Sequence, residues 1–252
     1  MDHEEDREDV DAALAPLFHD GTIGQAVARL TSGKEATVWC CEAGPALEGQ
    51  AGGLIAVKAY RSEHDRSFRG HATYLDSSRI PGRRVRLAID KRTRAGREMM
   101  FGIWVEQEWE ALRDLWADGV SVPRPLRRAG HAIAMEYLGD EDGPAPLLRQ
   151  VRLDRATTRR VLLGLLDEVE RMLGLHRVHG DLSPYNVLWW QDRARIIDLP
   201  QTVDPRFEPQ ARAMLERDVT RLTDWAARSG VEHDPMRHCR RLWDRFRRGE
   251  VG

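Results

Sequence analysis

The chain has 252 residues, and its 39 Lys and Arg nearly balance its 41 Asp and Glu, for a formal net charge of −2. This balance argues against DNA or bulk nucleic-acid binding by the whole chain, and no apolar run approaches the roughly 20 residues that a membrane span requires. Three cysteines and an acidic start exclude a disulfide framework and a secretory signal, so we expect a globular protein in a reducing, cytoplasmic setting without a membrane partner.

The first half of the chain predicts a β-rich lobe. Residues 2–19 form an acidic stretch with an apolar stripe that we expect to be helical. Short β-type runs separated by glycine-containing turns indicate an antiparallel sheet over 23–30, 36–41 and 54–60. Residues 61–97 are polar and rich in Arg, with no sustained period, so we expect a long loop. Its Arg cluster is either a contact for RNA or an acidic partner, or a solvated run.

The remaining elements change from mixed to mainly helical. Apolar residues at helical spacing predict a long helix over 98–118, and two strands follow at 126–129 and 131–137. A segment with Gly and Pro then interrupts the regular pattern. Beyond it we expect helices at about 155–175, 208–229 and 235–248, with a short β pair formed by VLWW and ARIID.

These elements predict an α+β architecture with two lobes. The N-terminal lobe covers 1–137, a hinge covers 138–146, and the C-terminal lobe covers 147–252. A cleft between two such lobes is where a ligand would bind.

The segment VHGDLSPYNVLWW carries the clearest chemical signal. Asp181 and Asn186 stand five residues apart on a loop, and Asp198 follows the next β run. One carboxylate can accept a hydroxyl proton, while the amide oxygen and the other carboxylate suit Mg²⁺, which prefers oxygen ligands. The alternative is a turn in which these side chains cap the local backbone, but the ordered set favours phosphoryl transfer.

Lysine is scarce, and this scarcity directs attention to the positions where it is kept. Lys34, Lys58 and Lys91 are the only lysines, and every other cation is Arg. Lys58 lies in the apolar strand LIAVKAY, where it needs an anion such as a nucleotide phosphate or a carboxylate. Glu108 and Glu106 on the following helix are competing partners, and a solvated edge-strand lysine is the alternative interpretation.

The loop TSGKEA at 31–36 is a weaker signal. A glycine-containing loop can bring backbone N–H groups and a lysine near phosphates. It is not a Walker A loop, because Glu35 follows Lys34 where Ser or Thr would bind Mg²⁺. A plain hairpin turn remains the competing interpretation.

Together these motifs resemble the RIO kinases, a family of atypical protein serine/threonine kinases. The resemblance runs from about residue 31 to 231 and rests on SGKEA, AVKAY, WVEQEWEAL, GVSVPRP, AMEYLGDEDGPAPLL, VHGDLSPYNVLW and IIDLPQTV. It is nearest to the first RIO subgroup and its bacterial relatives. It implies a protein-kinase-like fold that uses ATP and Mg²⁺, with Mn²⁺ as an alternative ion.

The resemblance also assigns expected roles to individual residues. Asp181 would be the catalytic base and Asn186 and Asp198 the metal ligands, while the counterpart of Asp198 has been proposed to accept phosphate transiently. Lys58 would contact ATP phosphates and pair with Glu108. The remaining nucleotide contacts would come from Ser32, Gly33 and Lys34 in the phosphate-facing loop and from the backbone of Glu136 and Leu138 at the adenine. Pro200 departs from the small residue that many members carry, which puts the geometry of the metal loop in question.

Two further functions compete with a protein kinase or ATPase of this type. Aminoglycoside- and choline-type kinases share the HGDLxxxN and IID motifs, although the short segment before the catalytic loop disfavours their large substrate pocket. A nucleotide-gated assembly factor would instead bind a ribosomal subunit or RNA. The protein substrate itself is not encoded in a motif.

Overall fold

The computed structural model describes residues 14–33, 36–49, 53–60 and 94–251, with side chains of the first long helix described from residue 102 onward. Lys34, Lys91, the start of the acidic N-terminal stretch and residues 61–93 of the predicted loop lie outside the described residues. The chain forms two compact units, Met1–Glu110 with Arg124–Tyr137 and Ala111–Pro123 with Leu138–Gly252. Among the described residues, no helix is both long and apolar enough to cross a bilayer.

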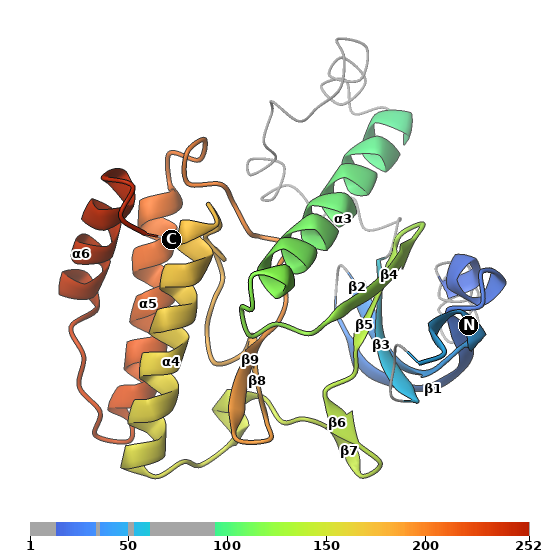
Figure 1. Cartoon of the computed structure of the whole chain (residues 1–252), viewed down its shortest axis with the longest axis horizontal. Helices are drawn as coiled ribbons and strands as arrows, with labels where there is room; N and C mark the ends of the chain where they lie inside the picture. Colours follow the sequence, from blue (N-terminus) through green and yellow to red (C-terminus); the bar gives the residue numbers. More distant parts are fainter. Residues whose placement is uncertain (1–13, 34–35, 50–52, 61–93, 252) are drawn as a thin grey trace. The chain divides into compact units, whose positions relative to one another are not determined.

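The first unit is built on a five-stranded antiparallel sheet with strand order β1-β2-β3-β5-β4 (Figure 1). Its strands are β1 (Ile23–Ser32), β2 (Ala36–Ala43), β3 (Leu54–Tyr60), β4 (Pro125–Ala129) and β5 (Ala132–Glu136), with the short 3-10 helix η1 (Pro45–Leu47) between β2 and β3. Each neighbouring pair is antiparallel, as the sequence predicted for the first three strands. Residues 14–19 are helical, which agrees with the end of the expected acidic helix.

The long helix α3 (Arg94–Ala117) begins before the predicted residue 98 and ends where the sequence indicated. Gly119 has φ +79°, the left-handed conformation in which glycine commonly ends a helix. Val120 then donates its N–H to the Leu115 carbonyl at 2.9 Å.

The central strand β3 is buried on both faces. Successive side chains of a strand point to opposite faces. Ile55 and Val57 therefore enter one apolar cluster, whereas Lys58 and Tyr60 lie on the other face of the sheet. Tyr60 meets Trp104 of α3 edge to face, with ring centroids 5.1 Å apart. Helix α3 therefore covers the face of the sheet that carries Lys58.

The second unit is mainly helical. Its helices α4 (Arg155–Gly174), α5 (Ala211–Ala227) and α6 (Pro235–Arg247) lie side by side (Figure 1). It also contains the 3-10 helix η4 (Leu148–Gln150) and two small hairpins, β6 (Gly139–Asp140) with β7 (Gly143–Pro144) and β8 (Val187–Trp190) with β9 (Arg193–Ile196). The predicted linker at 138–146 thus holds the β6–β7 hairpin.

Local sequence explains where the helices of this unit begin. Asp154 caps α4 by accepting the Thr157 N–H at 2.8 Å, and Asp234 caps α6 in the same way. Helix α5 begins later than the predicted residue 208, because Pro209 disfavours helical backbone at the residue before it.

Residues 111–123, which the sequence placed in the N-terminal lobe, belong to the second compact unit. The Ser121 hydroxyl donates to the Ala194 carbonyl at 2.8 Å. Arg177 pairs with Asp114 on the last turns of α3 at 2.9 Å. These contacts join the end of α3 to the β8–β9 hairpin and to the residues that follow α4.

Candidate active site

The loop between α4 and β8 holds Asp181 in a dense set of hydrogen bonds. The Asp181 N–H donates to His179 Nδ1 at 3.3 Å, and the Asn186 amide donates to the Asp181 carbonyl oxygen at 2.8 Å. The same amide lies 3.3 Å from Asp181 Oδ2. The structure therefore brings Asp181 and Asn186 together, as their spacing predicted.

Gly180 makes this loop geometry possible. Its φ is +83°, a conformation that L side chains rarely adopt. A Cβ atom at this position would lie 2.6 Å from Met214 Cε and 2.7 Å from the Gln201 carbonyl oxygen. The chain after β9 and helix α5 thus pack directly against the loop, and no side chain fits between them.

Asp218 of α5 fixes the loop through two backbone N–H groups, and sequence reasoning missed it. Its carboxylate accepts the Gly180 N–H at 2.8 Å and the Leu182 N–H at 3.0 Å. The residue is only 1% exposed, and burial raises the pKa of its carboxyl to about 7. One signal could have found it: Asp218 interrupts the buried stripe that Leu215 and Leu222 form on α5.

Two arginines of α5 also bind the loop, at Gly180 and at Asp181. Arg217 donates to the Gly180 carbonyl at 2.9 Å. Arg221 places Nη1 2.6 Å from Asp181 Oδ1, and both side chains of this ion pair are about two-fifths exposed. Sequence spacing could not reveal this pair, because the two residues are separated by 40 positions.

His179 links the loop to the segment that carries Asp198. Its Nδ1 accepts the Asp181 N–H, so Nε2 carries the proton and donates to the Ile197 carbonyl at 3.1 Å. Burial lowers the pKa of the imidazole below its ordinary value of 6.5. A neutral histidine therefore binds the backbone of Asp181 and that of Ile197, the residue before Asp198.

Asn186 and Asp198 have the chemistry of a site for a hard cation. The Ile197 N–H donates to the Asn186 carbonyl at 3.0 Å, which fixes the position of the next residue. Asp198 has φ +67°, a strained conformation for a residue other than glycine. The Asn186 amide nitrogen donates to Asp181, so the lone pairs of this side chain are those of its oxygen atom. An amide oxygen and a carboxylate fit Mg²⁺.

In the first unit, Lys58 and Glu108 form a buried ion pair. Lys58 Nζ lies 2.8 Å from Glu108 Oε1, and their side chains are 10% and 5% exposed. The competing partner Glu106 pairs instead with Arg128 of β4 at 2.8 Å. Lys58 also lies 5.2 Å from the centre of the Tyr60 ring. The solvated edge-strand interpretation of Lys58 is wrong, because β3 is a central strand.

The other residues expected to contact the nucleotide lie at the β1–β2 hairpin and near the end of β5. Ser32 and Gly33 are exposed at the end of β1, and the Gly33 N–H donates to the Ala36 carbonyl at 2.9 Å, which closes the β1–β2 hairpin. The Glu136 N–H donates to the Arg124 carbonyl, and the Leu138 carbonyl accepts the Ala145 N–H. The adenine contacts expected from the backbone of Glu136 and Leu138 stay a prediction.

Comparisons with known proteins agree with this fold and identify the family. The chain matches the family described as "RIO1: RIO domain" over residues 45–238. It is 34% identical over 142 residues to the RIO-type serine/threonine-protein kinase Rio1 of Thermoplasma acidophilum, covering 56% of this chain and 73% of that protein. It is 31% identical over 226 residues to Rio1 of Haloferax volcanii, covering 88% and 70%.

Longer relatives are matched over a smaller part of their length. The Caenorhabditis elegans serine/threonine-protein kinase RIO1 is 31% identical over 146 residues, which cover 58% of this chain and 28% of that protein. Among solved structures, the Rio2 kinase–ADP/Mg²⁺–phosphoaspartate complex from Chaetomium thermophilum matches with a TM-score of 0.64 at 19% identity. That match covers 90% of this chain and 64% of the Rio2 chain.

The fold is the kinase-like α+β fold, as the sequence predicted. The chain belongs to the RIO domain family of atypical kinases, and its class of enzyme is the RIO-type serine/threonine-protein kinase. The resemblance inferred from the catalytic motifs is confirmed.

Proposed function

We propose that this chain transfers the γ-phosphoryl group of ATP to Ser or Thr of a protein, itself included, or to water. The observation that carries the proposal is the single hydrogen-bonded loop that fixes Asp181 and Asn186 and, through His179 and Ile197, the backbone beside Asp198. Phosphoryl transfer depends mainly on positioning and charge stabilisation, which such a loop supplies. The serine/threonine specificity is taken from the relatives named above.

In this proposal Asp181 accepts the proton of the attacking hydroxyl. Arg221 occupies Oδ1 and Asn186 approaches Oδ2, yet a carboxylate has about four lone-pair sites, so acceptor capacity remains. The two contacts orient the carboxylate without consuming it. Asp218 acts through the backbone and sets the position of the loop.

Asn186 and Asp198 would hold Mg²⁺, which neutralises charge on the phosphate oxygens when it is bound. Lys58, oriented by Glu108, would contact the ATP phosphates. Ser32, Gly33 and Lys34 would add contacts from the β1–β2 loop. The backbone of Glu136 and Leu138 would meet the adenine edge.

The Rio2 structure contains ADP, Mg²⁺ and phosphoaspartate, and we extend this observation to Asp198. A carboxylate oxygen of Asp198 would bond to the γ-phosphorus while the bond from that phosphorus to the leaving ADP oxygen breaks. Water would then release inorganic phosphate and restore the carboxylate. This cycle would make the chain an ATPase as well as a kinase.

The test measures ATP hydrolysis and incorporation of labelled phosphate in the purified chain with ATP and Mg²⁺. Asp198→Ala should abolish both signals, whereas Asp224→Asn, an exposed change on α5, should leave them unchanged. Hydroxylamine cleaves an acyl phosphate but not a phosphoserine, so it separates the two products. Unchanged turnover in Asp198→Ala would refute the proposed role.

The acceptor is a separate question. Phosphorylation of an aminoglycoside in preference to protein would favour the small-molecule alternative. Mass spectrometry of phosphorylated residues and of co-purifying proteins or RNA, with and without ATP, tests the protein substrate and the ribosomal-subunit hypothesis together.

A further inference from the structure

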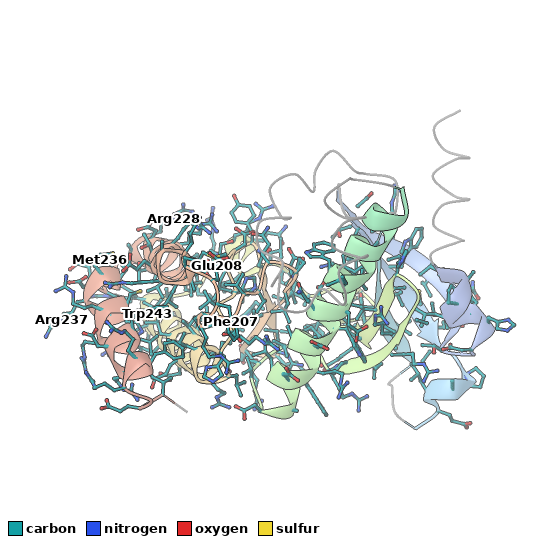
Figure 2. The ribbon with its side chains drawn as sticks, turned by 90° about the horizontal axis from the view of Figure 1, so that it is seen from above. Phe207, Glu208, Arg228, Met236, Arg237 and Trp243 are labelled. Atoms are coloured by element: carbon teal, nitrogen blue, oxygen red, sulfur yellow. The ribbon has the colours of Figure 1, made fainter. Side chains whose placement is uncertain are left out.

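A pocket of about 380 Å³ lies in the second unit, bounded by α6, the residues before it and Glu170 of α4. None of the residues that line it belongs to the candidate active site. Its polar lining comes from three arginines, two histidines and two carboxylates: Arg237, Arg241, Arg245, His233, His238, Glu170 and Asp234. Arg237 lies on α6 at the solvent-facing edge of this unit (Figure 2). The pocket therefore joins arginine and histidine side chains in a concave surface.

The arginines give the pocket an excess of positive charge. Arg237, Arg241 and Arg245 are spaced four residues apart, so they follow one face of α6. Arg245 is already paired with Glu170 at 2.6 Å. Within the part of the chain that the structure describes, Arg237 and Arg241 make no ion pair. The second carboxylate of the lining, Asp234, accepts the Arg237 backbone N–H at 3.0 Å as the helix cap, so the three arginines outnumber the two carboxylates.

Two histidines supply buried polar atoms that lack a partner. The rings of His233 and His238 are 5.2 Å apart, inclined at 60°. The Nε2 atom of each ring is buried and makes no hydrogen bond in the described structure. Buried polar atoms are normally satisfied, and an orphaned one costs free energy until a ligand or water pairs with it.

These groups suit an anion better than a metal ion. Among the described residues, no cluster of three His, Cys, Asp or Glu could hold a metal. Guanidinium groups bind phosphate oxygens through two parallel N–H donors, and imidazole N–H groups add further donors. Burial and the neighbouring His233 lower the pKa of His238, with Arg241 acting in the same direction and Glu170 and Asp167 of α4 opposing them.

We propose that this pocket binds a phosphate monoester through Arg237, Arg241, His233 and His238. The volume exceeds that of one phosphate group, which leaves room for the group to be carried on a larger molecule, and a phosphorylated side chain of a protein is the source we favour. Free inorganic phosphate shares the same chemistry. The proposal is independent of the function proposed for the catalytic loop.

The test measures binding of a fluorescein-labelled phosphoserine peptide and its unphosphorylated twin by fluorescence anisotropy at physiological salt. The full chain should prefer the phosphopeptide by at least about tenfold, the size expected for charge-assisted hydrogen bonds to one phosphate. Arg237→Ala/Arg241→Ala should remove the preference. Arg240→Ala/Arg247→Ala, which removes the same charge from α6 outside the pocket, should retain it.

Two further measurements complete the test. Inorganic phosphate that displaces the peptide only in large excess assigns the site to phosphorylated protein, and displacement at equal concentration assigns it to the free anion. Histidine NMR signals of the unmodified chain should shift for His233 and His238, but not for exposed His19, when phosphate is added. Equal binding of both peptides, equal loss in both double variants, or unshifted histidine signals would each overturn the proposal.

Discussion

Replacing Gly180 with alanine should damage both stability and catalysis, and the structure gives the size of the effect. The new Cβ would lie 2.6 Å from Met214 Cε and 2.7 Å from the Gln201 carbonyl oxygen. The methionine tip can move, but the carbonyl belongs to the backbone that follows Asp198. Alanine also has to adopt φ +83°.

The two costs can be added as an estimate. A left-handed conformation costs an ordinary residue about 1–2 kcal/mol. Forcing an extra carbon into a packed site costs about 1–3 kcal/mol. Gly180→Ala should therefore lower the free energy of unfolding by roughly 2–5 kcal/mol. Any separation of the Asp181 loop from the Asp198 segment should also slow ATP turnover, since a displacement of about 1 Å can cost about 100-fold in rate.

Urea unfolding followed by tryptophan fluorescence, together with ATP turnover below the transition, measures both effects. Gly164→Ala is the matched control, because Gly164 lies within α4 and a Cβ there meets nothing within 4 Å. That change should raise stability by roughly 0.5–1 kcal/mol through helix propensity. Wild-type stability in Gly180→Ala, or an equal loss in the control, would refute the argument.

Three further predictions concern charged and titratable groups. Lys58→Arg should lower ATP turnover by about 100-fold, because a planar fork cannot keep the compact geometry of the buried pair with Glu108, and full turnover would contradict this role. Arg221→Gln should change unfolding by less than about 1 kcal/mol, since its ion pair is half-exposed, yet should lower kcat, whereas Arg212→Gln on the same helix should change neither. Burial lowers the pKa of His179, so the folded protein binds fewer protons than the unfolded chain below pH 6.5 and should lose stability as pH falls, by up to about 1.4 kcal/mol per pH unit. The stability difference between wild type and His179→Gln should therefore shrink from pH 7.5 to 5.5, and a constant difference would show that His179 carries no such linkage.

The helical period of α3 indicates which of the two glutamates pairs with Lys58. Glu108 stands four residues after Trp104 and four before Leu112, and all three are buried on one stripe of α3. Glu106 lies off that stripe and reaches Arg128 instead. The choice between the two glutamates could thus have been made from the helix period alone.

The hydrogen bonds around Asp181 could not have been found in this way. Asp218 and Arg221 come from α5, and nothing local in the sequence says which turn of that helix meets the catalytic loop. The positive φ of Asp198 is likewise a property of the packed chain, because no glycine marks it.

The sequence by itself determined the strands, the main helices and the ordered set of Lys58, Asp181, Asn186 and Asp198, because hydrophobic period and motif spacing are local properties. It also determined family membership. Only the tertiary structure decided that α5 clamps the catalytic loop, because long-range hydrogen bonds depend on how helices pack. The same is true of the arginine and histidine pocket beside α6, where neighbouring elements create concavity that no single segment encodes.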